Sequence, residues 1–331
     1  RQSLAATLAV AAVGLLAAVP AAAQKTQLTV YTALETDQLK AYQEGFAKAN
    51  PDIEITWVRD STGVITAKLL AEKANPRADV VMGVAATSMG VFDAEGMLQP
   101  YAPQGLSRIA SQYRDPKNPP AWVGMDVWGA TICFNTVEAA KRNIPKPETW
   151  KDLTKPVYKG QIVMPNAASS GTGYLQVVSI LQMKGEEKGW QFLKDLDKNM
   201  AQYIKSGSRP CKMAATGEFA IGVSFAFSGV KQIMEGYPIK LVIPSEGAGY
   251  EVEVSMLMKT AKNKPDSKTF FDWLLTLDAA KLYGERAEMS SVPGAKATEA
   301  ILKAGLPADY WSSEVQLQRY EVQKWKEAPI P

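Results

Sequence analysis

Residues 28–82 decide the fold: LTVYTALETDQLKAYQEGFAKANPDIEITWVRDSTGVITAKLLAEKANPRADVVM. The apolar residues in this stretch switch repeatedly between strand and helix periodicity. The successive elements are a strand at 28–31, a helix around 39–46, a strand at 53–57, a helix at 64–70 and a buried strand at 78–82. Asn50-Pro51 and Asn75-Pro76 follow the two helices and stop them. This β-α-β-α-β order predicts a mainly parallel sheet covered by helices.

A second region repeats the same alternation further along the chain. After a Pro-rich stretch and an aromatic, β-branched strand at 122–134, the sequence predicts a strand at 161–164, a helix from Tyr174, a polar helix around Trp190 and a strand at 221–224. Alternation returns at 250–258 and is followed by helical spacing from Phe270 to Leu277. The fold class expected is therefore α/β, with two lobes that follow one another.

The first 23 residues have the order of regions found in a secretory signal peptide. Arg1 precedes an almost wholly apolar run from Leu4 to Val19, and Ala21-Ala22-Ala23 supplies small residues for cleavage. A membrane anchor is the alternative, but the run falls short of the roughly 20 residues that a spanning helix needs. No Cys lies near Ala23 to take a lipid. We expect cleavage after Ala23 and a mature protein that diffuses freely in the periplasm.

Charge and composition exclude several classes of function. The 37 basic and 34 acidic residues leave a net charge of only +3, which does not favour binding to nucleic acid or to a membrane surface. The chain has no His, so Ser-His-Asp and Cys-His catalysis and imidazole-ligated metal sites are excluded. A binding protein without a cofactor is the expectation. A secreted hydrolase or transferase that uses only carboxylates and hydroxyls is the alternative.

The two cysteines, Cys133 and Cys211, are the only ones in the chain. In an oxidising compartment they form either a disulfide or a pair of inert thiols. Sequence spacing does not decide between them, because a disulfide requires a specific geometry.

Two polar loops lie where a strand leads into a helix, one in each predicted lobe. The first is Ser61-Thr62-Gly63 and the second runs from Asn166 to Gly173, NAASSGTG. Unpaired backbone N–H groups and the helix dipole favour an anion at such places, and hydroxyls add further donors. An ordinary N-cap is the alternative for each loop taken alone. Two such loops could clamp one small anion between closing lobes.

Other candidates lie near predicted strand ends, where open α/β sheets usually bind ligands. They are the polar turn beginning at Ser206, the aromatic residues Tyr31, Trp128, Phe225 and Phe227, and the carboxylates Glu35, Asp126 and Glu246. Aromatic residues are more often part of a core, and most carboxylates are simply solvated.

Several separated motifs resemble the periplasmic substrate-binding proteins of ABC importers, in particular the 2-aminoethylphosphonate-binding branch near the ferric-iron binders. They are LTVYTA at 28–33, DSTG at 60–63, GMDVWG at 124–129, PNAASSGTG at 165–173 and GEFAIGVS at 217–224. The resemblance implies a two-lobed type II periplasmic binding protein fold with a two-strand hinge. The implied division is a signal peptide at 1–23, the first part of lobe 1 at 24–124, lobe 2 at 125–252, and a return to lobe 1 with C-terminal helices at 253–331.

The resemblance also implies a function and a site. A monomeric periplasmic protein would capture 2-aminoethylphosphonate between its lobes and deliver it to an inner-membrane permease. The residues expected to bind it are Tyr31, Thr32, Glu35, Ser61, Thr62, Asp126, Trp128, Ser169, Ser170, Gly171, Thr172, Ser206 and Phe225. The hydroxyl loops would hold the phosphonate, Glu35 or Asp126 the ammonium group, and the aromatic residues the wall.

Rival functions of the same fold remain at this stage. One is binding of ferric ion or of another small anion. Iron-binding relatives typically carry adjacent tyrosines where this chain has Phe225-Ala226-Phe227, and phenyl rings cannot ligate Fe³⁺. Another is a sensor that reports occupancy to a receptor instead of a permease.

Overall fold

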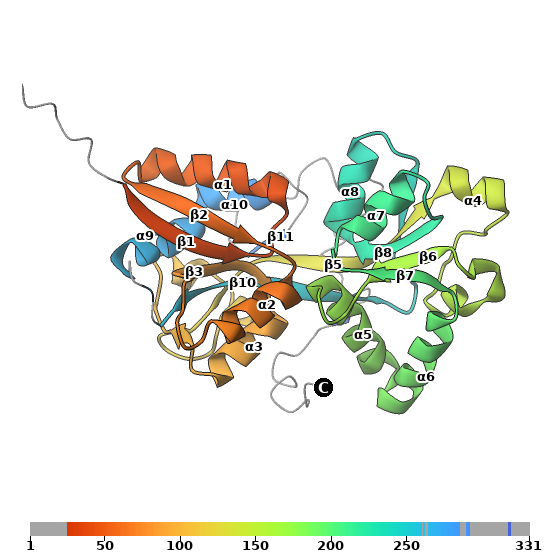
Figure 1. Ribbon diagram of the computed structural model, residues 1–331, viewed down its shortest axis with the longest axis horizontal. Coiled ribbons are helices and arrows are strands. Elements are labelled where there is room, and N and C mark those ends of the chain that lie inside the picture. Colours follow the sequence, from red (N-terminus) through yellow and green to blue (C-terminus); the bar gives the residue numbers. More distant parts are fainter. Residues whose placement is uncertain (1–24, 260, 262–263, 285–288, 292–316, 319–331) are drawn as a thin grey trace, which may run out of the picture.

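The computed structural model describes residues 25–259, 261, 264–284, 289–291 and 317–318 (Figure 1). The predicted signal peptide lies outside the described residues. Two lobes share one sheet, whose strands follow the order β2-β1-β3-β10-β5-β8-β6-β7. Within the described residues, no helix is long and apolar enough to cross a bilayer.

The first lobe contains most of the stretch that predicted the fold. Its strands are β1 (Thr26–Thr32), β2 (Ile53–Arg59), β3 (Val80–Ala85) and the short β4 (Leu98–Gln99). Its helices are α1 (Thr36–Ala49), α2 (Thr62–Ala71), α3 (Ala86–Ala94), α9 (Lys264–Leu274) and α10 (Leu277–Gly284). Strand β1 pairs in parallel with both β2 and β3, as the β-α-β-α-β pattern predicts.

Two long strands, β5 (Val123–Asn135) and β10 (Ala248–Met258), run from one lobe into the other. They pair antiparallel with each other over Val123–Gly129, and the remainder of β5 pairs with second-lobe strands. The register of β10 shifts twice, between Glu253 and Val254 against β5 and between Val254 and Met256 against β3. These strands form the two-strand connection that the resemblance implied.

The second lobe repeats the layered arrangement of the first. Its strands are β6 (Ile162–Pro165), β7 (Met200–Ile204), β8 (Ile221–Phe225) and β9 (Ile239–Val242). Its helices are α4 (Thr136–Arg142), α5 (Gly171–Lys184), α6 (Glu186–Asp197), α7 (Arg209–Ala215) and α8 (Ala226–Met234). Strand β6 pairs in parallel with β7 and β8, and β5 is antiparallel to β8.

Shorter elements complete the chain. They are the 3₁₀ turns η1 (Leu106–Arg108), η2 (Ser111–Tyr113), η3 (Lys151–Thr154) and η4 (Pro156–Tyr158) and the two-residue strands β11 (Met289–Ser290) and β12 (Leu317–Gln318).

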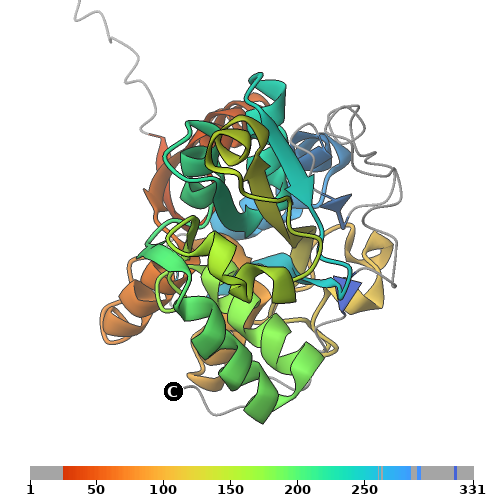
Figure 2. The same cartoon turned by 90° about the vertical axis from the view of Figure 1, so that its right-hand side faces the viewer.

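Helices cover both faces of the sheet in each lobe (Figures 1 and 2). Successive strand residues point to opposite faces, and central strands such as β3 and β5 are buried along their whole length, so both faces need cover. In β1, Leu28 and Val30 pack toward α1 and α9, whereas Tyr31 joins the core under α2 and α3. In the second lobe, β5 ends next to α7, and Cys133 is joined there to Cys211 by a disulfide with a Cα–Cα distance of 5.3 Å. The disulfide is fully buried in a small apolar cluster with Ala214 and Ile239.

The predicted boundaries at 124/125 and 252/253 fall within β5 and β10, the strands that cross between the lobes. A boundary inside a shared strand is a matter of definition, so this division stays a prediction. Most of the predicted C-terminal segment from 285 onward lies outside the described residues.

Candidate functional site

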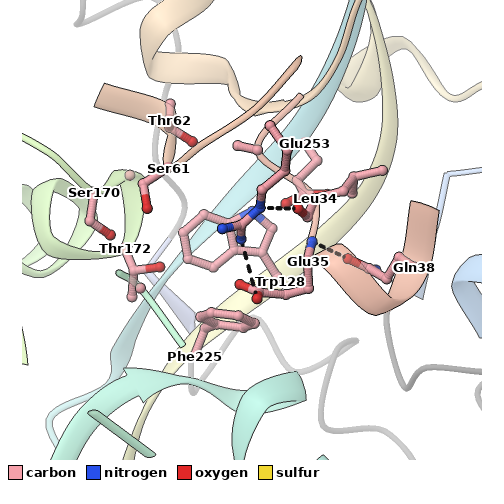
Figure 3. A pocket seen from close by; sticks show the side chains of 14 residues that line it. Leu34, Glu35, Gln38, Ser61, Thr62, Trp128, Ser170, Thr172, Phe225 and Glu253 are labelled. Atoms are coloured by element: carbon pink, nitrogen blue, oxygen red, sulfur yellow. Dashed lines mark hydrogen bonds and ion pairs between the residues drawn. The ribbon is translucent and has the colours of Figure 1, made fainter. Parts of the chain in front are cut away.

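A cleft lies between the lobes at the carboxyl ends of the parallel strands (Figure 3). It contains about 490 Å³ of space between atoms, part of which is open to solvent. The lining residues come from both lobes: Ala33, Leu34, Glu35, Gln38, Arg59, Ser61, Thr62, Glu253 and, from the crossover and the second lobe, Trp128, Ser170, Gly171, Thr172, Gly207 and Phe225. The hydroxyl groups gather on one side, and Glu35 and Gln38 lie on the other.

The hydroxyl side is made by the first residues of α2 and α5. Ser61 precedes α2, but its side chain does not cap that helix. Among the described residues, the hydroxyls of Ser61, Thr62 and Thr172 have no hydrogen-bond partner, although these residues are more than nine-tenths buried. Ser170 does act as an N-cap, accepting a long bond of 3.4 Å from Gly173 N–H. The hydroxyl oxygens themselves are not among the fully buried atoms that lack a partner, so they are accessible from the cleft and can donate to a ligand there, which favours a ligand site over the ordinary N-cap.

Glycines let the two helix N-termini meet across the cleft. A Cβ at Gly63 would lie 2.2 Å from the carbonyl oxygen of Ala168, in the opposite lobe. A Cβ at Gly171 would lie 3.0 Å from Thr62 Oγ1. Only a residue without a side chain permits such an approach. The lobes are therefore in contact, and the structure represents the closed form.

Arg59 brings a positive charge into the cleft at the end of β2. Its Nε donates to the carbonyl oxygen of Leu34 at 2.7 Å, and a guanidinium nitrogen lies 3.2 Å from Glu35 Oε2. Burial raises the pKa of Glu35, while Arg59 and a Ser208 hydrogen bond oppose that rise. Glu35 N–H in turn donates to Gln38 Oε1 at 2.6 Å, which fixes the start of α1.

Aromatic side chains form the floor of the cleft. The Trp128 and Phe225 rings meet edge to face with centroids 5.8 Å apart. Trp128 is 6 % exposed, and its Nε1 has no hydrogen-bond partner among the described residues. The floor therefore combines apolar surface with a buried donor.

Two ion pairs join the lobes beside the cleft. Lys205 Nζ, after β7, lies 2.7 Å from Asp60 Oδ2 at the end of β2. Lys231 on α8 pairs with Asp37 on α1. Burial opposes ionisation of Asp60, but hydrogen bonds from Lys205 and from Ser61 N–H outweigh it and lower its pKa. These two ion pairs between the lobes add to the stability of the closed form.

The structure brings eight of the predicted binding residues together in the cleft, namely Glu35, Ser61, Thr62, Trp128, Ser170, Gly171, Thr172 and Phe225. Tyr31 does not line it, because its ring faces the core under α2 and its hydroxyl donates to Glu72 at 2.8 Å. Thr32 is fully buried, and its Oγ1 accepts from Leu34 N–H.

Three further predicted binding residues and the candidate carboxylate Glu246 also lie outside the lining. Asp126 is fully buried on β5, opposite Glu253 of β10. The Ser169 hydroxyl is within 3.2 Å of the Lys205 carbonyl oxygen, away from the other hydroxyls. Ser206 Oγ lies 3.2 Å from Ser208 Oγ, whereas its neighbour Gly207 lines the cleft. Glu246 accepts from Trp150 N–H at 2.8 Å and does not line the cleft.

Sequence reasoning missed Gln38, Arg59 and Glu253, whereas Gly207 belongs to the polar turn that it did single out. A basic residue two positions after a predicted strand, as Arg59 is, was a usable signal, because strand ends converge at one edge of a parallel sheet. Glu253 offered no local signal, since it reaches the cleft only through the pairing of β10 with β5. In the described part of the chain, no group of three or more His, Cys, Asp or Glu residues is arranged to hold a metal ion.

Known proteins resemble this chain in both sequence and fold. The family model described as bacterial extracellular solute-binding protein matches residues 75–303. An uncharacterised protein of Haemophilus influenzae strain Rd is 30 % identical over 310 residues, covering 91 % of this chain and 86 % of that protein. The probable ABC transporter periplasmic-binding protein y4fP of Sinorhizobium fredii is 28 % identical over 298 residues, covering 88 % and 80 %.

A solved structure shows the same architecture. The periplasmic binding protein AfuA of Actinobacillus pleuropneumoniae, with fructose-6-phosphate bound, superposes with a TM-score of 0.79 at 26 % identity, covering 92 % of this chain and 98 % of that one. The predicted type II periplasmic binding protein fold is thereby confirmed. The chain belongs to the bacterial extracellular solute-binding proteins.

Proposed function

We propose that this protein is the periplasmic binding component of an ABC importer and that it captures a small organic phosphonate or phosphate ester. 2-Aminoethylphosphonate is the leading candidate from the sequence. The observation that carries the proposal is the set of hydroxyls of Ser61, Thr62 and Thr172, which line the cleft at two facing helix N-termini and have no hydrogen-bond partner among the described residues.

A tetrahedral oxyanion suits this side of the cleft. Helix N-termini carry unsatisfied N–H groups and a partial positive charge. The hydroxyls of Ser61 and Thr62 from one lobe and of Thr172 from the other can each donate to a separate phosphonate oxygen. The Arg59 guanidinium adds a full charge nearby. AfuA, whose bound solute is a phosphate ester, supports a phosphoryl ligand for this fold.

The opposite side of the cleft suits an ammonium group. Glu35 and Glu253 both line it, and Trp128 and Phe225 offer aromatic faces to a cation. Glu35 keeps the role that the sequence suggested, whereas Glu253 takes the place of Asp126. The phosphonate of one small zwitterion would then contact both lobes while its ammonium group contacts the first lobe, which favours closure.

Delivery of the ligand to the permease depends on closure of the two lobes. A ligand that contacts both helix N-termini binds the closed form better than the open one, so occupancy shifts the population toward closed protein. The permease in the inner membrane would recognise that closed surface. The relationship to y4fP supports such a partner.

The test is calorimetric binding of 2-aminoethylphosphonate to the mature protein and to matched variants. Thr172→Val keeps the shape of the side chain and removes its hydroxyl, so affinity should fall by about tenfold or more, because hydrogen bonds to charged groups contribute about 1.5–3 kcal/mol. Ser169→Ala is the matched control, because the Ser169 hydroxyl donates to the carbonyl oxygens of Lys205 and Asn166 and does not line the cleft. If Thr172→Val and wild type bind 2-aminoethylphosphonate with equal affinity, the phosphonate does not bind at the hydroxyl side of the cleft.

The amine assignment has its own test. Glu35→Gln should reduce the preference for 2-aminoethylphosphonate over ethylphosphonate, whereas binding of ethylphosphonate should change little. An unaltered preference removes Glu35 from that role. A coloured ferric complex that phosphonates do not displace would favour the iron alternative, and turnover of a phosphonate would favour an enzyme.

A further inference from the structure

A second cavity adjoins the first and shares Glu35 with it. It lies between the start of α1 and helices α7 and α8, and contains about 540 Å³ of unfilled space that is partly open to solvent. Gly207 lines the first cavity and the adjacent Ser208 the second, so the two spaces lie on either side of this turn. A solute held in the first cavity can therefore extend past Glu35.

The second cavity contains a buried acceptor with no protein donor. Gln232 on α8 lines it and is 5 % exposed, and its Oε1 has no hydrogen-bond partner among the described residues. A buried amide oxygen in this state is unfavourable unless a ligand or water supplies a donor. Ser228 Oγ–H already donates to the Ser208 carbonyl oxygen at 2.9 Å, which leaves the Ser228 oxygen as a further acceptor. Gln232 and Ser228 therefore both offer oxygens that can accept a hydrogen bond from a ligand.

The charges around the cavity are balanced. Glu35 is paired with Arg59, and Asp37 is paired with Lys231. Glu235 and Lys212 add one further charge of each sign to the lining. The lining carries three carboxylates and two lysines, and the Arg59 guanidinium, which pairs with Glu35 from the first cavity, supplies the third positive charge. With the charges balanced in this way, a neutral donor needs no counterion. A hydroxyl group is the simplest donor of this kind.

We propose that the second cavity binds the hydroxylated end of a phosphorylated solute whose phosphoryl group occupies the first. The substrate class is then phosphate esters of short polyols or sugars, with 2-aminoethylphosphonate filling the first cavity alone. This inference rests on the proposed function, because it places the phosphoryl group at the facing helix N-termini. Gln232 is the specificity-determining residue.

The experiment compares fructose 6-phosphate with 2-aminoethylphosphonate on wild-type protein, Gln232→Leu and Gln202→Leu by calorimetry. Gln202 is an exposed residue of β7 in the same lobe, so its variant controls for the amide loss itself. We expect Gln232→Leu to weaken fructose 6-phosphate by about tenfold more than 2-aminoethylphosphonate, the value of one hydrogen bond. Thermal unfolding of unliganded Gln232→Leu should match or exceed that of wild type, because the variant removes an unpartnered buried oxygen.

The outcomes separate the two proposals. If wild-type protein binds 2-aminoethylphosphonate but Gln232→Leu weakens both ligands equally, or neither, the second subsite is overturned and the phosphonate function stands. If neither ligand binds and other phosphonates and phosphate esters also fail, the proposed function is overturned together with this inference. Gln232→Glu provides a further check, because it keeps acceptor oxygens and should weaken fructose 6-phosphate less than Gln232→Leu does.

Discussion

Replacing Gly63 by alanine should separate folding from closure. Gly63 lies in the first turn of α2, where alanine normally stabilises a helix by about 0.5–1 kcal/mol relative to glycine. In the closed form, however, the new Cβ would lie 2.2 Å from the Ala168 carbonyl oxygen and 2.8 Å from the Ser169 carbonyl carbon, well inside the ordinary contact range of 3.4–4 Å. Both atoms are backbone of the opposite lobe and cannot rotate away.

The magnitude follows from that overlap. Forcing an extra methyl group into a packed contact costs about 1–3 kcal/mol. The cost falls on the closed form alone, because the open form separates Gly63 from Ala168. Affinity for a ligand that binds the closed form should therefore drop by about 5- to 150-fold. The unliganded protein should melt at the same temperature as wild type or higher.

The matched control is Gly90→Ala in α3 of the same lobe, where a Cβ meets no atom within 4 Å. Calorimetry with 2-aminoethylphosphonate and thermal unfolding are measured for wild type and both variants, and small-angle scattering records compaction on ligand addition. We expect Gly90→Ala to bind as wild type does. If Gly63→Ala also binds and compacts as wild type does, the facing helix N-termini do not form the closed contact, and the reasoning is refuted.

Three other perturbations have defined outcomes. Burial raises the pKa of Glu251 from 4.5 to about 8. The folded protein therefore keeps a proton that the unfolded chain loses above about pH 4.5, and the stability of the folded state falls as pH rises through 8. The melting temperature of Glu251→Gln should exceed that of wild type by a larger margin at pH 9 than at pH 5. Lys205→Ala removes the exposed ion pair with Asp60 and should weaken ligand binding by less than about fivefold. A salt concentration of 1 M should abolish this difference, because salt screens exposed charges. Weakening that does not depend on salt would contradict this account of the ion pair. Cys133→Ala with Cys211→Ala opens a loop of 78 residues and should lower the unfolding free energy by about 2–4 kcal/mol in denaturant titrations, whereas an unchanged midpoint would argue against the bridge.

Most of the fold was predictable because it depends on periodicity. The alternation from Leu28 to Met82 gave the parallel pairing of β1 with β2 and β3. The aromatic, β-branched run at 122–134 became β5, within one residue at each end. Periodicity did not reveal that β5 and β10 pair across both lobes, since such long-range pairing depends on the assembled sheet.

The site was predictable where a motif fixes its own geometry. Ser61 and Thr172 lie at strand-to-helix junctions, and parallel strands place these junctions at a common edge. Tyr31 was wrongly expected there as a wall residue, because alternation predicts a strand without saying which face meets the cleft, and its ring packs under α2. Asp126 failed as a lining residue for the same reason, being held on β5 among buried neighbours.

The two register shifts of β10, at Glu253/Val254 and Val254/Met256, lie next to the cleft wall that Glu253 contributes. A bulge bends and twists a strand locally while the ladder on either side stays intact. Bending can thus be concentrated in the bulged segment of β10 while the strand stays continuous, so opening of the lobes should require no strand to detach from its partner. Amide exchange that changes with occupancy should then be concentrated at residues 253–256 and at the helix N-termini, while the ladders within each lobe exchange equally slowly in both states.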